Sequence, residues 1–217
     1  MHFTDMTTFL DRSSTQDAEK HCLAWAVLPA DLHTPVRIFL ALREAGRRPC
    51  LLESAEGPDR LARYSFFGIN PDQLFTGGLS GAKLETPLGV EKFDGPCHEA
   101  FGEVLSRAEG ASTPSHLPPF CGGWVGAFSY EWAATLEPKV AIPVNDPWEF
   151  PAAEFRRYPV VVALDHASQR IVLVIDCPDG EVNYLSAQEI LSGIAEDLAR
   201  PAPPIGSFKS IGDIKPA

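Results

Sequence analysis

Two short segments of the sequence combine an acid, a hydroxyl and a cation. Leu52, Glu53 and Ser54 end an apolar run, and Arg63 opens an aromatic one. An amino acid needs a carboxylate for its ammonium, a guanidinium for its carboxylate and apolar surface for its side chain. We therefore predict an amino-acid-binding site at Glu53, Ser54 and Arg63. The alternative is a salt bridge between Glu53 and Arg63, which is common on protein surfaces.

Motifs of the familiar enzyme classes are missing from the sequence. It has no G-x-x-x-x-G-K-S/T loop, no H-E-x-x-H helix and no paired Cys/His spacing for zinc. Residues 122–126 do not complete G-x-G-x-x-G, and residues 78–82 stop one glycine short of G-x-S-x-G. We predict no catalytic, cofactor-binding or metal-binding residue in this chain.

The segments with charged groups lie within a mixed pattern of strands and helices. Strands are predicted at residues 22–28, 50–52, 64–69, 73–76, 82–86, 158–165 and 170–176, and helices at 34–46, 96–108 and 183–199, with a helical turn at 131–136. Residues 166–169 are short enough for a hairpin, and the strands at 50–52 and 64–69 could pair. The irregular alternation favours an α+β fold with a largely antiparallel sheet, or sheets, and packed helices over a doubly wound parallel fold.

The net charge and composition of the chain argue against nucleic acids and membranes as partners. The 217 residues carry 18 Lys and Arg against 29 Asp and Glu, a net charge of −11, so we predict neither nucleic-acid nor membrane binding. The longest wholly apolar run, residues 22–28, is far shorter than the roughly 20 residues of a membrane helix. The first twenty residues lack a signal-peptide pattern, and five scattered cysteines fit reduced thiols. These features predict a soluble, cytoplasmic protein.

Several short stretches between about residue 31 and residue 200 resemble, in the same order, the sequence of one known protein family. They are residues 34–36, 51–54, 63–66 with Gly68 and Pro71, 119–120 with 122–123 and 125–126, 129–130, Glu137 and 160–166. In this order they resemble the amino-terminal domain of anthranilate synthase component I and of its relative, aminodeoxychorismate synthase component I.

The resemblance implies that this is part of a larger enzyme. In the family this domain packs against a chorismate-binding catalytic domain, which carries the magnesium carboxylates and the catalytic residues. The complete lyase aminates chorismate with ammonia from a glutamine amidotransferase subunit. The implied organisation is a polar lead-in at 1–20, the domain at 21–200 and a tail at 201–217 that leads to an absent chorismate-binding domain. We expect the chain alone to be inactive.

The resemblance also implies regulation. The Leu-Leu-Glu-Ser segment of anthranilate synthases contributes half of a pocket for the feedback inhibitor tryptophan, which it shares with the catalytic domain. By position this points to Leu52, Glu53 and Ser54, with Arg63 nearby. The run at 51–57 favours the anthranilate branch and tryptophan biosynthesis. Departures at Ala127, Glu131 and Ala152 leave open the aminodeoxychorismate branch, which serves 4-aminobenzoate and folate biosynthesis. The other hypotheses are a free-standing amino-acid-binding module and an unrelated small α+β enzyme.

Overall fold

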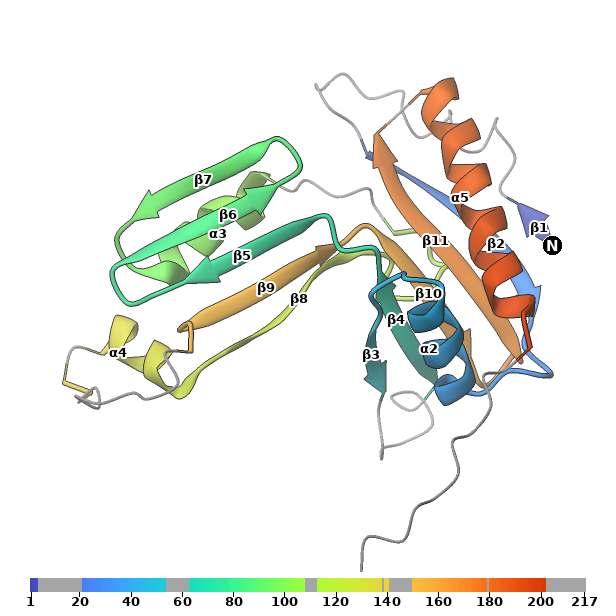
Figure 1. Ribbon diagram of the computed structural model, residues 1–217, viewed down its shortest axis with the longest axis horizontal. Helices are drawn as coiled ribbons and strands as arrows, with labels where there is room; N and C mark the ends of the chain where they lie inside the picture. Colours follow the sequence, from blue (N-terminus) through green and yellow to red (C-terminus); the bar gives the residue numbers. More distant parts are fainter. Residues whose placement is uncertain are drawn as a thin grey trace, which may run out of the picture.

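Two antiparallel sheets make up the framework of this computed structural model, which describes residues 1–3, 21–53, 63–107, 113–137, 139–140, 150–178 and 180–201 (Figure 1). The six-stranded sheet has the order β1 (His2–Phe3), β2 (His21–Pro29), β11 (Arg170–Pro178), β10 (Val160–Asp165), β4 (Tyr64–Ile69) and β3 (Cys50–Glu53). The five-stranded sheet has the order β7 (Gly89–Asp94), β6 (Gly81–Thr86), β5 (Gln73–Gly77), β9 (Ala153–Tyr158) and β8 (Gly123–Phe128). All pairings between these strands are antiparallel.

Helices cover one face of each sheet. Helices α2 (Pro35–Glu44) and α5 (Glu181–Ala199) contact each other and the six-stranded sheet, and Figure 1 shows both in front of it. Helix α3 (Cys97–Arg107) packs on the five-stranded sheet, and the 3-10 turn η1 (Tyr130–Trp132) and the short helix α4 (Ala133–Leu136) follow β8. The predicted α+β fold is confirmed. None of the helices in the described segments is long and apolar enough to span a membrane.

The larger core lies between the six-stranded sheet and its two helices. Phe67 and Ile69 of β4, Val162 of β10 and Ile194 of α5 are fully buried there. Side chains of a strand alternate between its faces, so residues 65, 67 and 69 of β4 all point toward the helices. Full burial of one such apolar side chain contributes about 1.5–3 kcal/mol before entropy is counted.

Helix α2 begins and ends where the sequence predicts. Thr34 is the N-cap, and its Oγ1 accepts a hydrogen bond from the backbone N–H of Arg37 at 3.2 Å. Pro35 occupies the first helical position, where its missing N–H costs nothing. After the helix, Gly46 adopts a φ of 75°, which a residue with a Cβ rarely adopts.

The opposite face of the six-stranded sheet carries a smaller apolar cluster. Leu23 and Val174 pack there against Leu117 and Cys121, which belong to the loop before β8. Phe120 from the same loop meets Phe66 of β4 edge to face, with ring centroids 5.7 Å apart. Even-numbered residues of β4 therefore point away from the helices and toward this loop.

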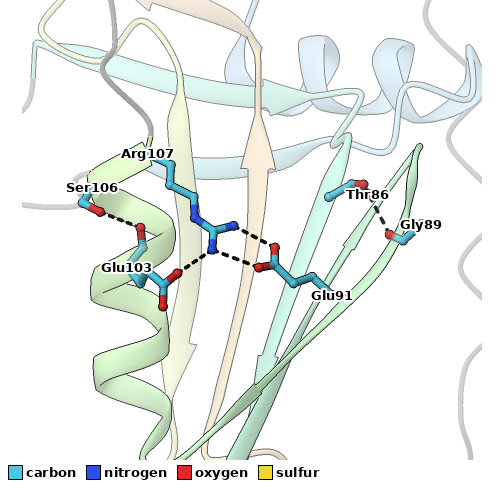
Figure 2. Close-up of polar contacts among 6 residues, drawn as sticks. All are labelled: Thr86, Gly89, Glu91, Glu103, Ser106 and Arg107. Atoms are coloured by element: carbon cyan, nitrogen blue, oxygen red, sulfur yellow. Dashed lines mark hydrogen bonds and ion pairs between the residues drawn. The ribbon is translucent and has the colours of Figure 1, made fainter.

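Aromatic rings fill the core of the five-stranded sheet, and ion pairs tie its helix to the edge. Phe101 of α3 stacks on Phe155 of β9 at a centroid distance of 4.3 Å. Figure 2 shows Arg107 at the end of α3 reaching Glu91 of β7 through two bonds of 2.7 and 2.9 Å, and also Glu103. These charged side chains are about half exposed, so the ion pairs stabilise the fold only modestly.

The two sheets join where β9 passes into β10. Arg157 of β9 pairs with Asp72 at 2.7 Å and with Asp176 of β11 at 3.3 Å. Gly68 of β4 lies against the ring of Tyr158, and a Cβ at Gly68 would stand 2.7 Å from that ring. The close approach therefore requires glycine.

Several boundaries differ from the sequence prediction. The strand predicted at 158–165 begins at Val160, because Tyr158 ends β9 in the other sheet. Strands β1, β7, β8 and β9 were not predicted. Residues 4–20 and 202–217 lie outside the described residues, so most of the predicted lead-in and tail is not described.

Candidate functional site

The segments with predicted effector residues meet at one end of the six-stranded sheet. Strand β3 ends at Glu53, β4 begins at Tyr64, and β10 ends at Asp165. Glu53 stands opposite Ser65, and Asp165 stands opposite Tyr64. The predicted pairing of the strands near residues 50 and 64 is therefore confirmed, and β10 adds its own end to the same place.

Three polar side chains share the helix-covered side of this end. The hydroxyl of Ser65 donates to Glu53 Oε1 at 3.1 Å and lies 2.8 Å from His166 Nε2. Ser65 is fully buried, whereas Glu53 and His166 are exposed. The two exposed groups are thus linked through one buried hydroxyl.

A separate ion pair occupies the opposite face. The guanidinium of Arg63 donates two hydrogen bonds to the carboxylate of Asp165, from Nε to Oδ1 at 3.0 Å and from Nη2 to Oδ2 at 2.6 Å. Its guanidinium also lies 4.9 Å from the ring centroid of Tyr64, which stacks on Phe66. Because Phe66 contacts the loop rather than the helices, Arg63 belongs to the face away from α2 and α5.

Asp165 also organises the turn that follows β10. Its Oδ1 accepts hydrogen bonds from the backbone N–H groups of Ala167 and Ser168 at 3.0 and 3.2 Å. Burial alone would raise the pKa of Asp165, but hydrogen bonds from Arg63, Ser168 and Ala167 outweigh burial and lower that pKa to about 2. Asp165 is therefore a strongly held carboxylate with a structural role.

The structure separates the two predicted charges. Glu53 accepts a hydrogen bond from Ser65, and Arg63 pairs with Asp165 on the other face. Glu53 and Arg63 therefore do not form the salt bridge that was the alternative prediction. Leu52 is 39% exposed on the edge strand. Ser54 lies outside the described residues.

Ser65, Asp165 and His166 are the members of this group that sequence reasoning missed. Asp165 and His166 follow Arg63 by about one hundred residues and join it only through the pairing of β4 with β10. The sequence signal that could have identified Asp165 and His166 was the predicted hairpin at 166–169, because it placed these two residues at the end of a strand.

The described side chains do not gather into a set of metal ligands. Within the described segments, no three His, Cys, Asp or Glu side chains converge closely enough to hold a metal ion. The side chains that the structure describes therefore do not form a magnesium site.

Known proteins match most of the chain. No protein-family model matches it. Anthranilate synthase component 1 of Saccharomyces cerevisiae is 28% identical over 190 residues, which are 83% of this chain and 35% of that protein. Probable anthranilate synthase component 1 of Schizosaccharomyces pombe is 31% identical over 176 residues, 78% of this chain and 32% of that protein. Anthranilate synthase component 1 of Cereibacter sphaeroides is 28% identical over an alignment 224 residues long, which covers 97% of this chain and 44% of that protein.

A solved structure has the same fold. The crystal structure of anthranilate synthase component I from Streptococcus pneumoniae aligns with a TM-score of 0.52 at 22% identity, covering 81% of this chain and 37% of that one. The chain thus has the α+β fold of part of that structure. It spans about a third of the length of the first curated relatives that it matches. The resemblance to an amino-terminal part of anthranilate synthase component I is confirmed.

Proposed function

We propose that this chain is the regulatory and structural amino-terminal domain of an anthranilate synthase component I. The observation that carries the proposal is that about 80% of the chain matches about a third of several proteins that all bear this name. In the complete lyase, chorismate and ammonia would give anthranilate for tryptophan biosynthesis. Magnesium and the catalytic residues would lie in a separate chorismate-binding domain, and a glutamine amidotransferase subunit would supply the ammonia.

The effector pocket belongs to this proposal. Glu53 is exposed and would hold the ammonium of tryptophan, while Leu52 and Ser54 would contact the rest of the ligand. The Arg63 side chain is 45% exposed despite its pairing with Asp165 and would approach the ligand carboxylate. Because Glu53 and Arg63 lie on opposite faces, a ligand that uses both must sit across the end of the sheet.

Exposed apolar side chains support a domain partner. Tyr130 is 82% exposed, Leu136 54% and Phe150 72%, and all three lie in the connection from β8 to β9. Interfaces between domains of one chain bury about 600–1,500 Å². A catalytic domain that packs here would remove these side chains from water, which is favourable.

The proposed compartment is the cytoplasm. The five cysteines all lie in described segments, and no disulfide joins them. Burial raises the pKa of the Cys121 thiol to about 11, so this thiol stays protonated and unreactive at neutral pH. Reduced cysteines are typical of cytoplasmic proteins.

The test is feedback inhibition of an enzyme reconstituted from this chain and a co-expressed chorismate-binding domain. Tryptophan should inhibit anthranilate formation, and Glu53→Ala and Ser54→Ala should weaken that inhibition. Glu91→Ala is the control, because Glu91 is an exposed carboxylate in the five-stranded sheet, where it pairs with Arg107 of α3 (Figure 2). If both test variants keep wild-type inhibition, the pocket is misplaced.

The same assay distinguishes the alternatives. An enzyme that ignores tryptophan and forms aminodeoxychorismate would assign the chain to the folate branch. A chain that binds an amino acid but associates with no chorismate-binding domain would instead be a free-standing binding module. Departures from the family pattern at Ala127 and Ala152 motivate the first of these comparisons.

A further inference from the structure

We propose that Ser65 and His166 are positioning residues that hold the Glu53 carboxylate ready for the ammonium group of an amino-acid effector. The inference rests on the proposed function, because it concerns the same site. It adds two residues that neither touch the ligand nor belong to the Leu-Leu-Glu-Ser segment. The observation behind it is the buried hydroxyl of Ser65 between Glu53 Oε1 and His166 Nε2, at 3.1 and 2.8 Å.

The direction of the hydrogen bonds follows from counting protons. An ionised carboxylate only accepts hydrogen bonds, and a serine hydroxyl has a single proton to donate. Ser65 gives its proton to Glu53, so its oxygen can only accept from His166. His166 must therefore carry a proton on Nε2, whether its ring is neutral or charged. The resulting relay runs from His166 through Ser65 to Glu53.

The fold holds the donor end of this relay in place. The backbone N–H of His166 donates to the carbonyl oxygen of Arg63 at 2.9 Å, and Gln169 Nε2 donates to the carbonyl oxygen of His166 at 2.8 Å. Asp165, the preceding residue, is fixed by the bidentate Arg63 contact and by its turn. Arg63 thus also acts on the Glu53 side of the sheet, by fixing the backbone that carries His166.

The hydrogen bond from Ser65 holds the Glu53 carboxylate by one oxygen and leaves the other oxygen to accept from an ammonium group. Ser65 occupies Oε1 of Glu53, and within the described segments no hydrogen bond is recorded to Oε2. A carboxylate that is already held by one oxygen loses less rotamer freedom when a ligand binds to the other. A held carboxylate also favours ligands with an ammonium group over ligands that lack one.

Nuclear magnetic resonance on the 217-residue chain tests the relay without any ligand. Nitrogen shifts of the neutral His166 ring should show its proton on Nε2. A proton on Nδ1 instead would overturn the inference, because Ser65 would then have to donate to His166 and not to Glu53. His166 is exposed, so its replacement leaves the buried core intact.

Ligand titrations on the enzyme reconstituted from this chain and a co-expressed chorismate-binding domain test whether Ser65 and His166 position Glu53 for the ligand. Ser65→Ala and His166→Ala should each weaken L-tryptophan binding by about tenfold, the effect of one modest hydrogen bond. His166→Gln keeps a donor near the Nε2 position and should restore binding. Indole-3-propionate, which lacks the ammonium, should bind all variants alike. Ser106→Ala, at an exposed serine of α3, is the control (Figure 2).

The outcomes separate the two proposals. If tryptophan binds and depends on Glu53, but the Ser65 and His166 variants bind it as the wild type does, the relay does not position Glu53 and only this inference fails. If His166→Gln is as weak as His166→Ala, donation from Nε2 is not the cause and the inference also fails. If the reconstituted wild-type enzyme binds no tryptophan, the effector pocket of the proposed function fails, and a relay serving that pocket fails with it.

Discussion

Replacing Asp165 by asparagine should destabilise the chain in a way that depends on pH. Asparagine keeps the shape of the side chain and one oxygen for the turn, but it removes the negative charge that Arg63 grips. The pKa of Asp165 falls from 3.8 to about 2 in the folded chain. At about 1.4 kcal/mol per pKa unit, the ionised form stabilises the fold by about 2.5 kcal/mol at neutral pH.

The sign of the pH dependence follows from the lowered pKa. Above the unfolded value of 3.8 the full stabilisation is present, and it is lost as the pH falls toward the folded value of about 2. The asparagine side chain of the variant does not titrate, so the difference between Asp165→Asn and wild type should be largest at neutral pH. It should shrink progressively over this acidic range.

Urea denaturation at several pH values measures this difference. Glu91→Gln is the matched control: Glu91 also holds an arginine with two bonds, but its side chain is 45% exposed against 7% for Asp165. Water screens the exposed pair, so the control should change stability much less. The reasoning is refuted if Asp165→Asn equals wild type near pH 7, or if the gap between them stays constant down to about pH 3.

Three further predictions concern packing and the exposed surface. Gly126→Ala should lower the free energy of unfolding by about 1–3 kcal/mol or more, because the added Cβ would overlap the carbonyl oxygen of Glu154. Gly102→Ala, where the added Cβ meets open space on α3, should be neutral or stabilise the chain by up to about 1 kcal/mol. Thermal unfolding of the two variants measures the difference. Ile194→Ala should cost about 2–5 kcal/mol in urea denaturation, because the residue is fully buried between α5 and the sheet. Tyr130→Ser should reduce binding of a hydrophobic dye by the isolated chain, and unchanged dye binding would argue against an apolar surface at this position.

Elements with apolar runs could be predicted from the sequence. Strand β4, predicted at 64–69, and helix α2, opened by Thr34, formed as expected because burial and capping act locally. Strands β7 and β9 were missed for a physical reason. Strand β7 is an exposed edge with charged residues, and β9 alternates Phe155 with charged neighbours, so neither presents an apolar run.

The candidate site was predictable only in part. The sequence identifies Glu53 and Arg63 as chemically suited to an amino acid, but their partners depend on strand register. Ser65 faces Glu53 because β3 pairs with β4, and Asp165 reaches Arg63 because β10 pairs with β4. A shift of one residue in either register would move every side chain to the other face. Such pairing energies are spread over whole strands and are not visible in a short segment.

Turnover of chorismate with ammonia is the measurement that tests the central claim most directly. The chain alone should form no anthranilate. A co-expressed chorismate-binding domain should associate with it, and the pair should form anthranilate in a reaction that tryptophan inhibits. Anthranilate formation by the purified chain alone would contradict the account, as would a catalytic domain whose turnover and tryptophan inhibition are the same with and without this chain.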